Sequence, residues 1–98
     1  MQVLESKVER DFVRLLDGAG FVHIKLDGRN KSGWPDRLIL LSAGQAIFVE
    51  LKRPGEVPSD LQKYIHDNLR KLGYPVIVND NATVAFKLLL QYAGLPRE

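Results

Sequence analysis

Hydrophobic and polar positions divide the first half of the chain into one helical and three extended segments. Leu4 to Gly18 carries apolar residues at helical spacing, namely Leu4, Val8, Phe12, Leu15 and Leu16. Phe21 to Leu26 alternates apolar and polar residues, which is typical of a short strand. Two more apolar strands, Arg37 to Leu41 and Ala46 to Lys52, flank a turn at residues 42–45. This pattern predicts a β-hairpin in which Gly44 adopts a positive φ.

The second half of the chain predicts helix, strand and helix. Ser59 is a candidate N-cap, and Gln62 follows at capping-box spacing. The apolar stripe of this helix consists of Leu61, Ile65, Leu69 and Leu72, and Gly73 ends it. Pro75 to Val78 is a short apolar strand, and residues 79–81 cap a last helix from Ala82 to Ala93.

The order is therefore helix, three strands, helix, strand, helix. The connection from Lys52 to Pro75 is long enough to return the chain for a parallel strand pair. We expect an α/β fold with a mixed four-stranded sheet flanked by helices. At 98 residues the chain is expected to form one domain, residues 1–98.

Composition narrows the function classes. The chain has no cysteine, which excludes a disulfide framework, a cysteine zinc site and a thiol nucleophile. Its longest near-continuous apolar run, Leu38 to Leu41, is far below the roughly 20 residues of a membrane span. The first residues do not resemble a signal segment, so we expect a cytoplasmic protein without a membrane partner. The net charge of +2 permits a polyanionic partner without requiring one.

Candidate chemistry lies at the open end of the predicted hairpin. With the turn centred near Ala43 and Gly44, Asp36 lies opposite or next to Glu50 and Leu51. Glu50 and Lys52 are two residues apart, so both side chains leave the same face of their strand. The pattern thus brings two carboxylates and one ammonium together.

Two neighbouring carboxylates repel each other, and a divalent cation removes that cost. Mg²⁺ prefers hard oxygen ligands, typically one or two carboxylates together with waters and phosphate oxygens. Lys52 beside such a site could orient a water or steady a phosphate. The chemistry that this set favours is phosphodiester hydrolysis, in which a metal polarises the phosphoryl group and acidifies a bound water.

These motifs resemble a known superfamily. Pro35-Asp36 followed by Glu50-Leu51-Lys52 is similar to the PD-(D/E)XK nucleases. The longer pattern resembles their VRR-NUC branch, the virus-type replication-repair nucleases, and consists of residues 33–37, residues 49–55, Ser59 and Gln62. The resemblance covers nearly the whole chain. It implies a restriction-endonuclease-like αβββαβ core, to which this chain adds a C-terminal helix.

The resemblance also assigns roles. It implies that Asp36 and Glu50 bind Mg²⁺ or Mn²⁺, with help from the backbone carbonyl of Leu51. Lys52 matches the catalytic lysine, and Gln62 matches a glutamine that supports the site from the following helix. A glutamate of the first helix usually completes the set of metal ligands and catalytic residues.

Glu5 and Glu9 are both candidates for that glutamate. Helical periodicity does not favour Glu9, because Glu5 lies deeper within the apolar arc. Residues 9–14, however, resemble the first helix of archaeal Holliday-junction resolvases, and on that likeness we choose Glu9.

Each residue also has a simpler interpretation. Glu50 and Lys52 could be a solvated pair on an edge strand, and Glu9 an ordinary surface charge. The capping box accounts for Gln62 without catalysis, although the two roles are compatible. Four basic residues could contact DNA phosphates near the site, although each alone is more simply a solvated charge: Arg29, Lys31, Arg53 and Lys63. His23 and His66 have no partner histidine at metal-ligand spacing, so we expect both to be structural or exposed.

The leading hypothesis is a Mg²⁺- or Mn²⁺-dependent endonuclease that acts on structured or branched DNA such as Holliday junctions. Cutting both strands of a junction implies a homodimer, and short stand-alone members of the family resemble phage proteins. No small-molecule cofactor is expected. A non-catalytic DNA-binding module of the same fold is the alternative, and a structural or interaction domain is a third.

Overall fold

The computed structural model describes residues 5–26 and 33–94 of the chain. Its helices are α1 (Glu5–Gly18), α2 (Asp60–Lys71) and α3 (Ala82–Tyr92), and Ser42–Gly44 form a short 3-10 turn, η2. Its strands are β1 (Val22–Lys25), β2 (Arg37–Leu40), β3 (Ala46–Leu51) and β4 (Val76–Asn79). This order is the one that the sequence predicts, and the boundaries agree to within about one residue wherever the structure describes them.

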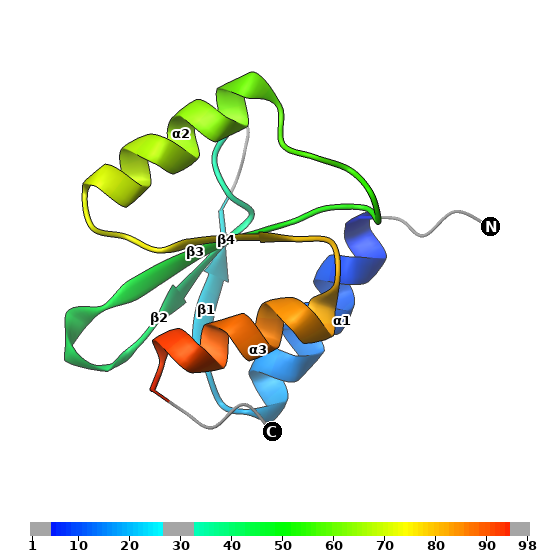
Figure 1. The fold of residues 1–98 in the computed structure, drawn as a ribbon. Coiled ribbons are helices and arrows are strands. Elements are labelled where there is room, and N and C mark those ends of the chain that lie inside the picture. Colours follow the sequence, from blue (N-terminus) through cyan, green and yellow to red (C-terminus); the bar gives the residue numbers. More distant parts are fainter. Residues whose placement is uncertain (1–4, 27–32, 95–98) are drawn as a thin grey trace.

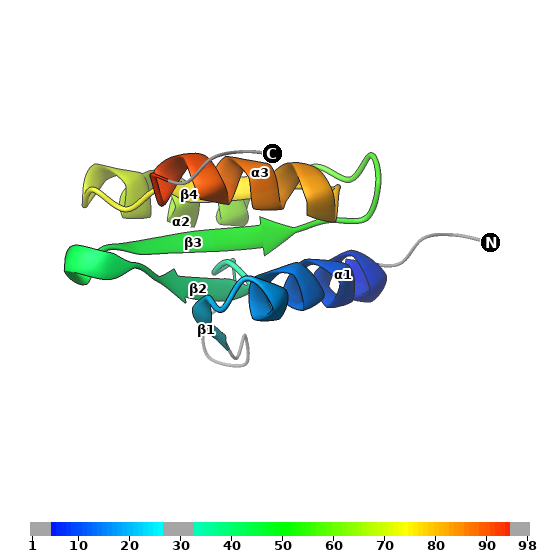
Figure 2. The same ribbon diagram turned by 90° about the horizontal axis from the view of Figure 1, so that it is seen from below.

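The four strands form one mixed sheet in the order β1-β2-β3-β4. β1 pairs with β2 and β2 with β3 in antiparallel fashion, while β3 and β4 are parallel. Helix α2 covers one face of this sheet, and α1 and α3 cover the other (Figure 1). Seen from below, α1 lies toward the β1 end of the sheet and α3 toward the β4 end (Figure 2).

The main hydrophobic core lies between the sheet and the helices α1 and α3. Alternate residues of β3 point into it, so that Ile47, Val49 and Leu51 are buried together. Phe12 and Leu16 reach the same core from α1, and other buried members are Val8, Ile39, Ile77, Ala85 and Leu89. Full burial of such a side chain contributes about 1.5–3 kcal/mol, so this larger cluster contributes more hydrophobic stabilisation than the smaller one under α2.

The face under α2 carries a smaller core and a polar region. Its buried apolar residues are Phe48, Leu69 and Val76, and Trp34 packs edge-on against Phe48 with ring centroids 6.0 Å apart. At the far end of β3 this face carries Glu50, and Lys52 follows the strand, so that a charged region lies beneath the start of α2. The same face is open over β1 and β2, where Val22, Ile24 and Leu40 are exposed.

Two details differ from the sequence-based expectations. The buried face of α2 is not its full apolar stripe: Leu61 is half exposed and Leu72 is 74% exposed, whereas His66 and Leu69 are buried. The helix is rotated so that polar side chains meet the charged end of β3. In the hairpin turn, Gly44 has the expected positive φ of 72°, and Ala43 also has a positive φ, of 61°. No helix within residues 5–26 and 33–94 is long and apolar enough to cross a membrane.

Candidate active site

Asp36 lies at the open end of the β2–β3 hairpin. The register pairs Arg37 with Val49, and the backbone N–H of Asp36 donates to the carbonyl of Val49 at 3.1 Å. The side chain turns toward the next residues of β3, where its Oδ2 accepts the backbone N–H of Leu51 at 2.8 Å. The hairpin geometry expected from the sequence is therefore correct, and Asp36 lies against the Glu50-Leu51 peptide.

Glu50 and Lys52 point from the end of β3 toward α2, and both are buried. Glu50 is 2% exposed and Lys52 6% exposed, and Nζ of Lys52 lies 3.2 Å from Oε2 of Glu50. This Oε2 atom makes no hydrogen bond, although it lies beside the ammonium. The interpretation as a solvated surface pair is thus wrong, because neither side chain is solvated. Their close contact is what burial requires, since buried charges persist only when they are paired.

Gln62 makes two sets of contacts, one within the capping box of α2 and one with Lys52. Its Oε1 atom accepts the backbone N–H of Ser59 at 2.8 Å, and its own N–H donates to the Ser59 hydroxyl at 3.2 Å, which completes the capping box. The same Oε1 atom accepts a hydrogen bond from Nζ of Lys52 at 2.8 Å. The start of α2 is thereby joined directly to the lysine that follows β3.

His66, which the sequence analysis expected to be either structural or exposed, is buried beside Glu50. It is 2% exposed, and its Nε2 lies 2.9 Å from Oε1 of Glu50. The absence of a second histidine at metal-ligand spacing says nothing about a histidine that contacts a carboxylate. The useful signal was its spacing of four residues from Gln62, because residues i and i+4 share one face of a helix.

Glu9 lies on the α1 side of the site and is held by two cations. Both of its carboxylate oxygens lie 2.8 Å from Nζ of Lys25, and Oε2 also accepts from Nε of Arg37 at 3.1 Å.

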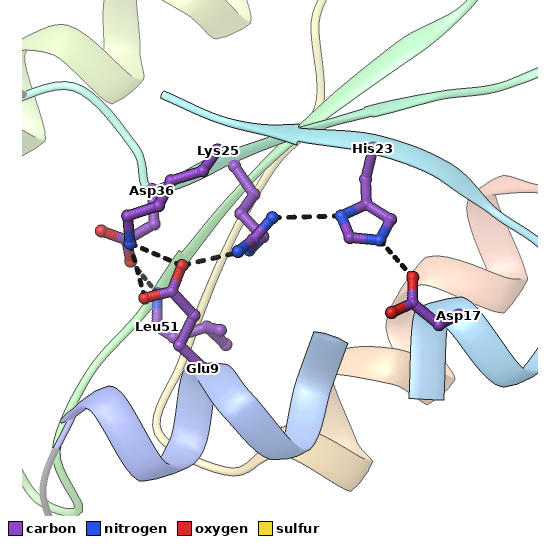
Figure 3. Close-up of polar contacts among 7 residues, drawn as sticks. Glu9, Asp17, His23, Lys25, Asp36 and Leu51 are labelled. Atoms are coloured by element: carbon purple, nitrogen blue, oxygen red, sulfur yellow. Dashed lines mark hydrogen bonds and ion pairs between the residues drawn. The ribbon is translucent and has the colours of Figure 1, made fainter. Parts of the chain in front are cut away.

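The contacts of Glu9 extend along the sheet through Arg37. Its guanidinium Nη1 lies 3.1 Å from Nδ1 of His23, and Nε2 of His23 lies 2.7 Å from Oδ1 of Asp17. Figure 3 shows Lys25, Glu9 and Asp36 converging at one end of this chain of contacts. The side chain of Glu5 lies outside the described part of the structure.

The electrostatic environment of Asp36 is unfavourable for a charged carboxylate. Burial raises its pKa most strongly, the hydrogen bond from the Leu51 N–H acts in the opposite direction, and the negative charges of Glu9 and Glu50 raise the pKa further. The structure therefore brings three carboxylates close enough to influence one another. Acids whose pKa is shifted by their surroundings are frequent at functional sites.

The expected DNA-contacting residues are only partly described. Arg53 and Lys63 are exposed, on the loop before α2 and in its first turn. Arg53 pairs with Glu56 through a contact of 3.6 Å. Arg29 and Lys31 lie outside the described residues. Lys25 and Arg37, the two basic side chains that contact Glu9, were not among the DNA-contacting residues expected from the sequence.

The chemistry of the donor set fits a hard divalent cation. Asp36 and Glu50 supply carboxylate oxygens, one of them a buried atom without a hydrogen bond, and the Leu51 backbone adjoins both. Within the described residues, no three His, Asp or Glu side chains form a cluster that could hold a metal ion. One or two carboxylates completed by waters and phosphate oxygens is, however, the usual environment of Mg²⁺ in phosphoryl-transfer sites.

Comparison with known proteins identifies the family. No family model matches the chain. Over 79 residues, however, it is 38% identical to "Putative nuclease p44" of Acyrthosiphon pisum secondary endosymbiont phage 1, covering 81% of this chain and 85% of that protein. A solved structure described as "VRR_NUC domain" is 30% identical with a TM-score of 0.77, covering 90% of this chain and 96% of that one.

A second solved structure, described as "VRR_NUC domain protein", has a TM-score of 0.82 and covers 98% of this chain and 93% of that one. At 19% identity it shows the shared fold alone. Together with the sequence relative and the first solved structure, it agrees with the architecture expected from the motifs. The chain belongs to the VRR-NUC family of nucleases.

Proposed function

We propose that this protein is a Mg²⁺- or Mn²⁺-dependent DNA endonuclease that hydrolyses phosphodiester bonds. The observation that carries the proposal is the convergence of Asp36 with the buried Glu50–Lys52 pair at one end of a rigid hairpin. Burying this pair beside a second acid costs stability and adds nothing to the apolar core. Such a cost is typical of functional sites.

The metal would be held by Asp36, Glu50 and the carbonyl of Leu51, with Glu9 as a further ligand from α1. When bound, it would polarise the phosphoryl oxygens and lower the pKa of a coordinated water. Glu9 reaches this role only by exchanging its contacts with Lys25 and Arg37. Those two cations can then contact the DNA backbone instead, because phosphate oxygens accept from the same donors.

Lys52 is proposed as the catalytic lysine. An ammonium group has three N–H donors, and Gln62 accepts one of them at 2.8 Å. Glu50 lies on another side, at 3.2 Å. The lysine is thereby held in a fixed direction, so that its remaining donor can meet a phosphate oxygen or a water without a search among rotamers.

The proposed substrate is branched or structured DNA such as a Holliday junction, cut by a homodimer of this single nuclease domain. The identity with a phage protein named as a nuclease supports the DNA substrate. The mildly positive net charge of +2 and the exposed Arg53 and Lys63 are compatible with phosphate contacts.

The test is incubation of the purified protein with four-way junctions, forks and plain duplex in Mg²⁺, Mn²⁺ or EDTA. We expect metal-dependent cleavage with preference for the junction, and a dimer by light scattering. Asp36→Asn, Glu50→Gln and Lys52→Ala should each reduce cleavage by about 10²–10³-fold or more while retaining the circular dichroism spectrum. DNA binding without cleavage in any metal would identify the non-catalytic binding module instead, and neither binding nor cleavage would end both interpretations.

A further inference from the structure

Helix α2 contacts the charged end of β3 through two side chains one turn apart. Gln62 accepts from Lys52 at 2.8 Å, and His66 lies 2.9 Å from Glu50. Gln62 and His66 are four residues apart on the helix, and their partners Lys52 and Glu50 are two residues apart along the extended chain. Both pairs can therefore form at the same time. Because both pairs are buried or nearly so, α2 fixes the direction of the lysine and of the glutamate together.

The contact between His66 and Glu50 assigns a proton. A carboxylate can only accept, so Nε2 of His66 carries the hydrogen and donates it to Oε1 of Glu50. This leaves Oε2 as the oxygen of Glu50 without a hydrogen bond, beside Lys52. One oxygen of the glutamate therefore contacts the helix, and the other lies beside the Lys52 ammonium without a hydrogen bond of its own.

We propose that His66 is a positioning residue for the nuclease site, which holds Glu50 through Oε1 so that Oε2 is available to the cation. The inference rests on the proposed metal-dependent function. Outer hydrogen-bond partners of metal-binding carboxylates act in this way, and their loss typically weakens metal affinity about 10–100-fold. His66 contacts neither DNA nor metal in this role; it acts through Glu50.

The experiment measures Mn²⁺ binding to the intact chain without DNA, by calorimetric titration or by the loss of the free-ion electron paramagnetic resonance signal. His66→Asn places its amide too close to the backbone to reach Oε1, and should raise the Mn²⁺ Kd by about 10–100-fold. His66→Gln places an amide nitrogen near the position of Nε2 and should restore most of the affinity. Where His66→Asn does not fold, His66→Leu gives the same comparison with an apolar side chain.

Leu69→Ala is the matched stability control. Leu69 is also buried on α2, but it packs against Phe48 and Val76 rather than Glu50. The Leu69→Ala substitution should leave a cavity in the core, which lowers the melting temperature, and it should leave the Mn²⁺ Kd unchanged. Equal Kd values for the wild type, His66→Asn and His66→Gln would overturn the role of His66. An absence of Mn²⁺ binding by the wild type itself would overturn the proposed function and, with it, the inference.

Discussion

The two sides of the candidate site hold their acidic residues in different ways. On the α2 side, Glu50 is 2% exposed and fixed by His66 and Lys52, both of which are also buried. On the α1 side, Glu9 is held by Lys25, which is largely exposed, and by Arg37, which is not. The first arrangement is part of the protein interior, and the second is an ion-pair network that reaches the surface.

This difference has consequences for stability and for exchange of partners. Removing one member of a buried pair typically costs about 3–5 kcal/mol, because the other charge remains buried without compensation. Exposed ion pairs contribute about 0–1 kcal/mol and are weakened by salt. The α2 side is therefore suited to holding fixed groups, and under the proposed function the exposed Lys25 contact of Glu9 is the one most readily exchanged for a divalent cation.

The largest expected effect compares the two glutamates directly. Glu50→Gln should reduce cleavage by about 10²–10³-fold or more, whereas Glu9→Gln should cost about 10–100-fold. In the proposed mechanism, Glu50 is already held in place by His66 and Lys52. Glu9, by contrast, would have to leave Lys25 and Arg37 before it could bind the metal. Single-turnover rates on a four-way junction measure both, with circular dichroism as the folding control. Equal losses of cleavage rate in the two variants would mean that Glu50 and Glu9 contribute equally to cleavage.

The next effect separates the two roles of Gln62. Gln62→Ala should reduce cleavage by about 10–100-fold, since Lys52 loses its acceptor, and should lower the free energy of unfolding by about 1 kcal/mol. Ser59→Ala removes the other half of the capping box without touching Lys52. It should show the same loss of stability with normal cleavage. Similar cleavage by both variants would leave Gln62 as a cap alone.

A smaller effect concerns the raised pKa of Asp36. Its pKa is raised, mainly by burial, so the native state binds the proton more tightly than the unfolded chain. The resulting penalty is fully present above the native pKa and disappears as pH falls below the ordinary value of 3.8. Asp36→Asn should therefore stabilise the metal-free protein by about 1 kcal/mol at neutral pH, although the same substitution is expected to impair cleavage.

Urea unfolding of the wild type and Asp36→Asn at several pH values tests this sign. The difference in stability should shrink as the pH approaches 4 from above. Asparagine retains an oxygen that can accept the Leu51 N–H, so that hydrogen bond does not obscure the comparison. A difference that grows on acidification would contradict the raised pKa.

The smallest effect probes the exposed side. Lys25→Met should change the free energy of unfolding by less than about 1 kcal/mol, and high salt should remove most of that difference. Thermal unfolding in low and high salt measures it. A salt-independent loss well above this range would show that Lys25 belongs to a rigid network like that of α2.

Local sequence signals predicted the secondary structure well for physical reasons that act at short range. The hairpin register follows from the position of Gly44. It correctly predicted that Asp36 lies beside the Glu50-Leu51 peptide. The capping residues Ser59 and Asn81 mark the starts of α2 and α3. Periodicity was less informative for α2, since Leu61 and Leu72 are exposed and a polar His66 is buried.

The sequence by itself determined the order of elements, the face shared by Glu50 and Lys52, and the family motifs, because these depend on spacing along one strand or one helix. Only the tertiary structure decided that His66 meets Glu50 and that Lys25 and Arg37 meet Glu9. Those contacts depend on the rotation of a whole helix over the sheet. That rotation is set by the summed packing of many side chains and carries no local signature.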